Sequence, residues 1–371
     1  MRWKDEHIAL TAADLQILSQ IHFKVDEIPL PDKDKPRLPP LWSPLSYLLW
    51  KHHGEAAPIL WREYRELQAL VKNRDTHYQR VQIPKNSGHG YRLLEIPDFE
   101  LRFHQEWIRE EILSHLPVDD CAYAYRKGVS VRDCAAVHCG QSVLLHLDIR
   151  DFFGSVTEEA VSFALHRATG YPEAMADFLA ALCCCHKRLP QGAVTSPQLS
   201  NLVFMPLDRS IRLWAQAHHW AYSRYADDIF LSGDIGDPQT AIGYIRDTLA
   251  YFGFRLNEEK TRIVRPGRQM RVLGITTNEK LQTTRRYRRQ VRQEVYYLLR
   301  YGEDAAGVKA AGDYETYLLQ LLGKVSFLLQ INPDDAQARQ DKEQLLQLWR
   351  QCPRKDPPWV PADLWDELPF D

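Results

Sequence analysis

Residues 222–232, Tyr-Ser-Arg-Tyr-Ala-Asp-Asp-Ile-Phe-Leu-Ser, decide how the rest of the sequence is interpreted. Apolar and aromatic residues flank the acidic pair, which predicts two short strands joined around Ala226-Asp227-Asp228. Asp227 and Asp228 would then lie at the tip of a hairpin. An isolated Asp-Asp pair is typical of an ordinary turn, so its meaning depends on which other segments lie beside it.

A third carboxylate ends a predicted strand upstream. Within residues 142–149 the side chains alternate between two faces, with Val143, Leu145, Leu147 and Ile149 on one and Leu144, His146 and Asp148 on the other. An unpaired carboxylate is costly to bury in a strand. Divalent cations bound by Asp148, Asp227 and Asp228 would remove that cost, and two such ions suit in-line phosphoryl transfer.

The segment between these carboxylates predicts a loop that opens a helix. It reads Leu189-Pro-Gln-Gly-Ala-Val-Thr-Ser-Pro197, followed by Gln-Leu-Ser-Asn-Leu-Val-Phe. Gly192 would allow close approach of the backbone to a ligand, and the N–H groups at a helix start suit phosphate or sugar oxygens. Taken alone, the segment is an ordinary loop-to-helix junction.

In this order and at this spacing, the segments resemble the reverse transcriptase family, most closely the bacterial retron-type enzymes. Residues 147–153 (Leu-Asp-Ile-Arg-Asp-Phe-Phe) and 225–228 (Tyr-Ala-Asp-Asp) look like the two catalytic motifs, and 189–197 looks like the nucleotide-pocket motif. The similarity extends over roughly residues 75–300 through Ala124-Tyr-Arg-Lys-Gly-Val-Ser, Gly253-Phe254 to Lys260-Thr261, and Val272-Leu273-Gly274.

The resemblance implies an α+β fold of the right-hand polymerase type. The expected domains are a helical and Pro-rich extension (1–74), fingers (75–140), a palm of antiparallel sheet and helices with the catalytic motifs (141–284), a basic helical thumb (285–350) and a C-terminal tail (351–371).

The resemblance also implies roles for the acidic residues and their neighbours. Asp148, Asp227 and Asp228 would be catalytic and would hold two Mg²⁺ ions, or Mn²⁺ in their place, with the backbone carbonyl of Ile149 completing a metal shell. Phe153 would lie under the sugar C2′ and exclude a 2′-hydroxyl, which favours DNA synthesis. The alternative is a core Phe, a role that fits Phe152 better because strand neighbours face opposite ways.

Four further residues would contact the incoming nucleotide. Gln191 and Gly192 would border its base and sugar. Lys260 would be the general acid for the leaving pyrophosphate, with a solvated Lys as the alternative. Arg92, on a predicted fingers hairpin, would grip the triphosphate, and Lys85 competes with it for this role.

Two stretches depart from the retron pattern. Cys134-Ala-Ala-Val-His138 stands where retron enzymes carry Asn-Ala-x-x-His, and Val272-Leu273-Gly274 stands where they carry Val-Thr-Gly. In retron enzymes these residues are associated with handling the structured RNA. The departures favour a divergent retron, or a related bacterial reverse transcriptase of phage defence, over a standard retron enzyme. A group II intron enzyme is less favoured than either.

Charge is concentrated near the C-terminal third. Residues 255–300 contain 2 Lys and 11 Arg against 4 Glu, in a chain whose net charge is -2. Such a local excess indicates a surface for a polyanion, with a solvated helix as the alternative. Five arginines of the predicted thumb are the nucleic-acid-binding candidates, namely Arg285, Arg286, Arg288, Arg289 and Arg292. All but Arg286 share one helical face by their spacing.

Composition fits a globular protein of 371 residues with 44% hydrophobic and 26% charged residues. We find no secretory signal and no membrane-length apolar run, and we expect a cytoplasmic, reduced protein. Seven cysteines are too few for a disulfide scaffold. The run Cys183-Cys184-Cys185-His186 and the group Cys134, His138 and Cys139 could suggest a metal site, but their spacing favours structural packing.

Residue patterns also predict individual elements. Helices are expected at 12–23, 98–116, 158–185 and 238–252, and from 285 to about 329. A hairpin is expected at 78–96 and a short strand at 271–276. Six prolines between residues 24 and 46 indicate a loop or linker.

The function implied by the resemblance is RNA-directed DNA polymerase activity in a bacterial anti-phage defence system. The expected partners are a structured non-coding RNA template, dNTP substrates, the DNA product and an accessory effector protein, with no membrane. Two other functions remain open for this sequence. One is a template-independent nucleotidyltransferase, and the other is a nucleic-acid-binding protein on a polymerase scaffold.

Overall fold

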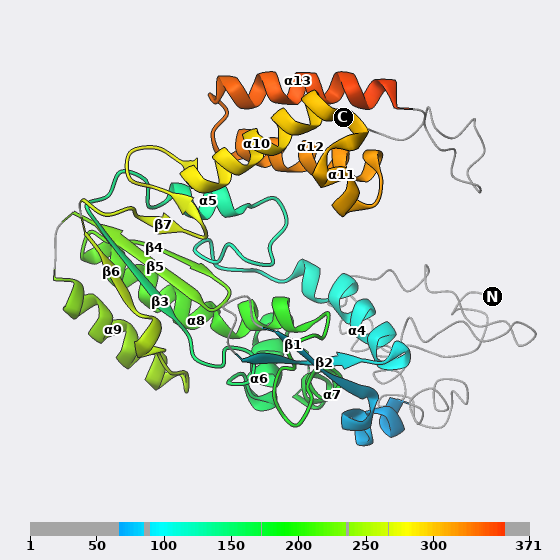
Figure 1. Ribbon diagram of the computed structural model, residues 1–371. Coiled ribbons are helices and arrows are strands. Elements are labelled where there is room, and N and C mark those ends of the chain that lie inside the picture. Colours follow the sequence, from blue (N-terminus) through cyan, green and yellow to red (C-terminus); the bar gives the residue numbers. More distant parts are fainter. Residues whose placement is uncertain (1–66, 85–89, 172, 235–236, 266, 353–371) are drawn as a thin grey trace, which may run out of the picture. The chain divides into compact units, whose positions relative to one another are not determined.

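The computed structural model describes residues 67–84, 90–171, 173–234, 237–265 and 267–352 (Figure 1). The predicted helix at 12–23, the Pro-rich segment at 24–46 and most of the C-terminal tail lie outside these ranges. The chain forms two compact units that divide between Arg268 and Gln269.

The first unit is built on a four-stranded antiparallel sheet with the order β4-β5-β3-β6. The strands are β3 (Val143–Asp148), β4 (Ala221–Tyr225), β5 (Asp228–Gly233) and β6 (Arg262–Val264). The predicted strand at 142–149 and the hairpin at 222–232 are therefore confirmed, and they pair directly with each other.

The two faces of this sheet have different coverings. Alternation places Leu145, Leu147, Ile229 and Leu231 on one face, where they join a large apolar core with α8 (Ser196–Ala217) and α9 (Pro238–Tyr251). The opposite face carries the three aspartates near one end. Farther along it, His138, which follows α5 (Val131–Ala136), shares hydrogen bonds with Ser223 and Ser232 at 2.7 Å each.

The remaining elements of the first unit extend the same core. They are η4 (Arg74–His77), β1 (Tyr78–Pro84), β2 (Tyr91–Pro97), α4 (Phe99–Glu111), η5 (Leu113–His115), α6 (Glu158–Thr169), α7 (Glu173–Cys183) and η6 (Glu258–Lys260). β1 and β2 form the predicted hairpin. The predicted helix at 98–116 begins after an Asp98 cap and ends at Glu111, and a short 3-10 turn follows it.

The second unit combines a small sheet with a helical core. It contains β7 (Arg271–Val272), β8 (Ile275–Thr276), β9 (Gln282–Thr283), α10 (Arg285–Tyr301), η7 (Gly302–Asp304), α11 (Ala306–Ala311), α12 (Tyr314–Ile331) and α13 (Ala336–Gln351). Val291, Val295 and Leu298 of α10 are buried in an apolar cluster with residues of α12 and α13. The helices predicted from residue 285 onward are confirmed.

One strand prediction was wrong. Residues 271–276 form two antiparallel strands of two residues each, not a single strand. The reason is the turn between them, where Leu273 and Gly274 have φ values of 51° and 82°. These left-handed values reverse the chain within two residues. The α+β class with antiparallel sheets is confirmed, and none of the helices in the described ranges is long and apolar enough to cross a membrane.

Candidate active site

The three predicted catalytic aspartates lie together because of strand register. β3 and β5 pair so that Asp148 is directly opposite Asp228, and Asp227 occupies the turn that joins β4 to β5. The backbone N–H of Ile149 donates to the Asp227 carbonyl at 2.9 Å, which ties the turn to the end of β3. Ala226 adopts a φ of 55°, a conformation uncommon for a residue with a Cβ. Strain of this kind concentrates at functional sites.

Two donors hold the buried Asp148 carboxylate. Asn257 Nδ2 donates to Oδ1 at 2.9 Å, and Lys260 Nζ donates to Oδ2 at 2.7 Å. The backbone N–H of Asn257 also donates to the Asp148 carbonyl at 2.8 Å. Lys260 therefore lies at the acidic site, not in bulk solvent away from it, although its side chain is 60% exposed.

His146 is a site residue to which sequence reasoning gave no role. Its Nε2 donates to Asp228 Oδ1 at 2.7 Å, and its ring stacks on Phe230 with centroids 4.7 Å apart. The alternation of β3 already placed His146 on the same face as Asp148. The missing information was the register that brings Asp228 within its reach.

The electrostatics of the site suit cations. Burial, and then the charges of Asp228 and Asp148, raise the pKa of Asp227 above its ordinary value. The hydrogen bond to Asp148 and the charges of the aspartates raise the pKa of Lys260. Hard carboxylate oxygens whose negative charges oppose one another are a fitting donor set for a divalent cation. In charge and donor type, the residues present therefore fit the divalent cations that the resemblance implies.

The aromatic residues after β3 divide between core and site. Phe152 is buried and packs on Phe204, with ring centroids 4.9 Å apart. Phe153 is half-buried, and its ring lies 6.4 Å from that of Tyr125. This division agrees with the expectation that Phe152 is the core residue of the pair. The sugar-gate role of Phe153 stays a prediction.

Tyr125 is a second residue that the sequence did not single out. It is 42% exposed and has a φ of 60°. Burial and the neighbouring Asp227 carboxylate raise its pKa, and the Arg224 and Arg92 guanidinium groups oppose them. Tyr125 thus lies beside Phe153 and near the Asp227 carboxylate. The contact of Arg92 with a nucleotide stays a prediction. Lys85, its competitor, lies outside the described residues.

The predicted nucleotide-pocket loop is fixed against the fingers hairpin. The N–H of Glu95 in β2 donates to the Gln191 carbonyl at 2.9 Å. Gly192 has a φ of 137°, and a Cβ there would meet the Glu95 carbonyl oxygen at 2.8 Å. Only glycine fits this close approach, which explains the residue type. The contacts of Gln191 and Gly192 with a nucleotide remain predictions.

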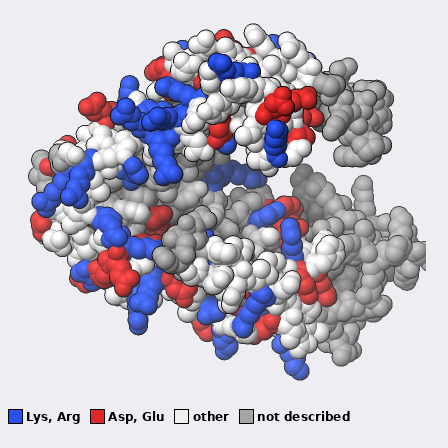
Figure 2. Space-filling model, viewed as in Figure 1, with Lys and Arg blue, Asp and Glu red and all other residues white. Residues whose placement is uncertain are grey.

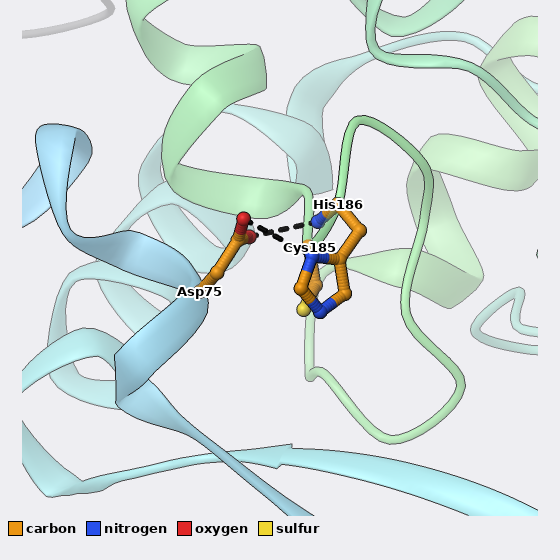
Figure 3. A group of neighbouring side chains, drawn as sticks. All are labelled: Asp75, Cys185 and His186. Carbon is orange, nitrogen blue, oxygen red and sulfur yellow. Dashed lines mark hydrogen bonds and ion pairs between the residues drawn. The ribbon is translucent and has the colours of Figure 1, made fainter.

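The cysteine run at the end of α7 contributes to a small polar cluster (Figure 3). Ligand atoms of Asp75, Cys185 and His186 lie within 4.8 Å of one another, the one such group of three in the described part of the chain. However, Arg80 Nη2 lies 2.6 Å from His186 Nε2, and a guanidinium only donates, so this nitrogen accepts. Burial raises the pKa of the Cys185 thiol to about 12. Both observations favour structural packing over a metal site.

The second cysteine group is also part of the interior. Cys134 and His138 are buried, and Cys134 Sγ lies 3.3 Å from Ser223 Oγ. Burial lowers the pKa of His138 to about 3, so the ring is neutral at pH 7. In this chain the segment therefore anchors α5 to the sheet.

The arginines of the predicted basic face lie at the start of α10, in the second unit. Figure 2 shows Lys and Arg side chains clustered where α10 begins. Arg285, Arg286 and Arg289 are exposed. Arg288 is half-buried and donates to Gln282, and Arg292 Nη2 lies 3.5 Å from Asp335 Oδ1. Two of the five arginines thus have partners within the chain, which the sequence pattern did not indicate.

Comparisons with known proteins agree with this geometry. The family described as reverse transcriptase (RNA-dependent DNA polymerase) matches residues 83–277. The chain is 34% identical to the retron Mx65 reverse transcriptase of Myxococcus xanthus over 288 residues, which cover 72% of this chain and 64% of that protein. It is 30% identical to the retron Ec86 reverse transcriptase of Escherichia coli over 236 residues, which cover 62% of this chain and 73% of that protein. The aligned part therefore spans less than two thirds of the Mx65 protein.

Proposed function

Because the chain belongs to the retron-type reverse transcriptases, we propose that it copies an RNA template into DNA. The cognate template would be a structured non-coding RNA of a bacterial anti-phage defence system, and the substrates would be the four dNTPs. The observation that carries the proposal is the β3–β5 register, which sets Asp148 opposite Asp228 with Asp227 in the adjoining turn.

The acidic side chains supply the ligands for catalysis. Asp148, Asp227 and Asp228, with the Ile149 carbonyl, would hold two Mg²⁺ ions, for which Mn²⁺ would substitute. When bound, these ions would lower the pKa of the attacking hydroxyl and offset charge on the leaving pyrophosphate. His146, Asn257 and Lys260 supply donors to the carboxylates, which supports a site where negative charge is oriented and balanced.

The other residues of the site would position the nucleotide. Phe153, with Tyr125 beside it, would exclude a 2′-hydroxyl, and Gln191 and Gly192 would border the base and sugar. Arg92 would bind the triphosphate. Lys260 would donate a proton to the pyrophosphate oxygen. Lysine is protonated at neutral pH and so holds the proton that it would donate. The hydrogen bond to Asp148 raises the pKa of Lys260, so the leaving pyrophosphate would have to displace that bond to receive the proton.

The charge distribution favours a nucleic acid duplex as the partner of α10. Arg285, Arg286 and Arg289 would contact phosphates of the template–product duplex, and Arg288 and Arg292 would join them by exchanging their internal partners for phosphates. A chain of this family would act in the cytoplasm, with an accessory effector protein as a further partner.

A primer-extension experiment tests the proposal. The purified chain receives a defined RNA, an annealed DNA primer, four dNTPs and Mg²⁺, and the product is sequenced. We expect DNA that is complementary to the RNA. When one dNTP is omitted, extension should stop before the first template position that requires it. Asp148→Asn should give no product. Products unrelated to the template would indicate a template-independent nucleotidyltransferase. Tight RNA binding without product would indicate a binding protein on a polymerase scaffold.

A further inference from the structure

A buried ion pair lies on the side of the sheet opposite the aspartates. Arg224 of β4 and Asp208 of α8 both have fully buried side chains. Arg224 Nε donates to Asp208 Oδ1 at 2.8 Å, and Arg224 Nη2 donates to Oδ2 at 2.6 Å. Tyr222 Oη also donates to Asp208 Oδ1 at 2.8 Å. The pair is thus bidentate and further hydrogen-bonded, as a buried pair must be.

The rest of the guanidinium reaches the catalytic turn. Arg224 Nη1 donates to the backbone carbonyl of Ala226 at 3.1 Å, and Nη2 donates to Asn201 Oδ1 at 3.0 Å. The guanidinium also lies 4.9 Å from the centre of the Phe204 ring. The fork is therefore fixed from several directions, and one of its N–H groups is directed at the peptide that joins Ala226 to Asp227.

The same network fixes the segment that carries Tyr125. Asn201 Nδ2 donates to the Ala124 carbonyl at 2.8 Å. The Arg224 backbone donates to the Cys121 carbonyl at 2.8 Å and accepts from the Tyr123 N–H at 2.9 Å. Residues on both sides of the site thus depend on the network formed by Asp208, Arg224 and Asn201.

Stability alone is a weak reason for this ion pair. Well-packed apolar residues commonly replace a buried pair with no loss of stability. Ala226, by contrast, has a left-handed φ of 55°, which persists only where the surroundings determine it. A hydrogen bond to the carbonyl of that residue, from a donor that is itself held rigidly, meets this need.

We infer that Arg224 is a positioning residue, which fixes the Ala226–Asp227 peptide through the Ala226 carbonyl and so orients Asp227 to bind a divalent cation. The inference rests on the proposed function, because it assigns Asp227 to metal binding. Arg224 itself touches neither substrate nor metal.

Two variants separate positioning from folding. Arg224→Met alone would leave the Asp208 charge buried and unpaired, so we combine it with Asp208→Asn, which keeps an acceptor for Tyr222. Arg224→Lys keeps the charge beside Asp208 and lacks the second arm that reaches Ala226. The matched control is Arg212→Lys, since Arg212, on α8, likewise makes a bidentate pair with a carboxylate, that of Asp119 at 2.9 and 3.1 Å.

The first readout is Mn²⁺ binding without nucleotide, measured by loss of the free-ion electron paramagnetic resonance signal. We expect both Arg224 variants to bind Mn²⁺ about 10-fold to 100-fold more weakly, because metal affinity commonly falls by this factor when a metal ligand loses the hydrogen bonds that orient it. We expect kcat for dNTP incorporation to fall about 100-fold with KM nearly unchanged. RNA affinity should stay close to wild type. Both variants should remain folded with a lower thermal unfolding midpoint, because buried acceptors such as the Ala226 carbonyl lose their donor. Arg212→Lys should leave Mn²⁺ affinity and kcat unchanged.

Several results would overturn the inference. Folded Arg224 variants that bind Mn²⁺ and incorporate dNTPs like the wild type would show that the ion pair serves packing. Unfolding of both variants would show that it serves the fold. Failure of the wild-type chain itself to bind Mn²⁺ and to synthesise DNA would instead contradict the proposed function on which the inference depends.

Discussion

Lys260 Nζ and Asp148 Oδ2 are 2.7 Å apart, so a lysine cation lies directly beside the aspartate that ends β3. The Lys260 side chain is mostly exposed, whereas that of Asp148 is buried. Lys260 thus offsets the charge of Asp148 while staying accessible to solvent. This position supports the proposal that Lys260 donates a proton to the leaving pyrophosphate.

For Lys260 we expect that Lys260→Gln slows single-nucleotide incorporation about 100-fold, the usual scale for losing a general acid. RNA affinity should change little, because the amide nearly keeps the size of the side chain and only a single positive charge is lost. Rapid-quench measurement of incorporation tests this, with Lys280→Gln as the control at an exposed site. A rate within about twofold of wild type would mean that Lys260 is a solvated residue.

For Asp227 we expect that Asp227→Asn abolishes synthesis, with a loss of at least about 1,000-fold, because it removes a metal ligand and preserves volume. Template binding should persist. Since the pKa of Asp227 is raised, acidification should also weaken metal binding at a higher pH than for an ordinary aspartate. Primer extension tests synthesis, RNA titration tests template binding, and Mn²⁺ titration at several pH values tests metal binding, with Asp247→Asn on α9 as the control. Substantial incorporation by Asp227→Asn would remove the catalytic assignment.

For Phe153 we expect that Phe153→Ala raises the use of rNTPs relative to dNTPs by about tenfold or more, because the space under C2′ opens. Tyr125→Ala should raise the ratio less, since Tyr125 supports the Phe153 ring from one side. Phe152→Leu is the matched control, because that neighbour packs in the core and should lower the unfolding midpoint without changing the ratio. An unchanged ratio in Phe153→Ala would place the gate elsewhere.

Two buried histidines predict how stability depends on pH. Burial lowers the pKa of His138 to about 3 and that of His104 to about 4, so the unfolded chain binds more protons below about pH 6.5. Stability should therefore be full above about pH 6.5 and fall on acidification toward about pH 4. Between about pH 6.5 and 5 the loss should be about 2 kcal/mol for each residue, at about 1.36 kcal/mol per pH unit.

Urea unfolding at about pH 7.5 and 5.0 checks this expectation. His138→Gln should be less stable near pH 7.5, because it disturbs the bonds to Ser223 and Ser232. It should nevertheless lose less stability than the wild type on acidification. His218→Gln, at an exposed position, should follow the wild-type slope. Equal slopes in the wild type and His138→Gln would contradict the assignment.

The parts of the site that follow strand alternation could be predicted from sequence. Alternation in 142–149 put His146 and Asp148 on one face of a predicted strand. The acidic hairpin at 225–228 supplied the other carboxylates, and its second strand pairs with the first. These features are local, so a single sequence determines them. The positions of Tyr125 and Arg92 could not be derived, because they depend on pairing between segments far apart in the chain.

Arg224 illustrates the limit of such reasoning. Its place beside Tyr225 and its partner Asp208, sixteen residues earlier, carry no periodic signal that distinguishes it from a surface arginine. Only the packing of α8 on β4 brings the two together. Likewise, the spacing of residues 285–292 predicts one helical face, but it does not reveal that Asp335 lies beside Arg292.

The exposed part of the basic face leads to the last prediction. Arg285, Arg286 and Arg289 carry three positive charges within five residues at the start of α10. Like charges this close repel one another, so phosphates should stabilise them. The triple variant to Gln should weaken binding of an RNA–DNA duplex and reduce the log–log salt slope by about one unit for each phosphate that is no longer neutralised. The fold should survive, because exposed substitutions change stability by only about 0.5 kcal/mol.

Titration at several salt concentrations measures both the affinity and the slope. A charge-matched control changes Arg102, Arg109 and Arg246 of the first unit to Gln, since these exposed or half-buried side chains pair with nearby glutamates. If the two triple variants change the salt slope equally, the effect is one of net charge. If the α10 variant alone flattens it, the first turn of α10 contacts the nucleic acid backbone. An α10 variant with unchanged affinity and slope would make this helix an ordinary solvated face.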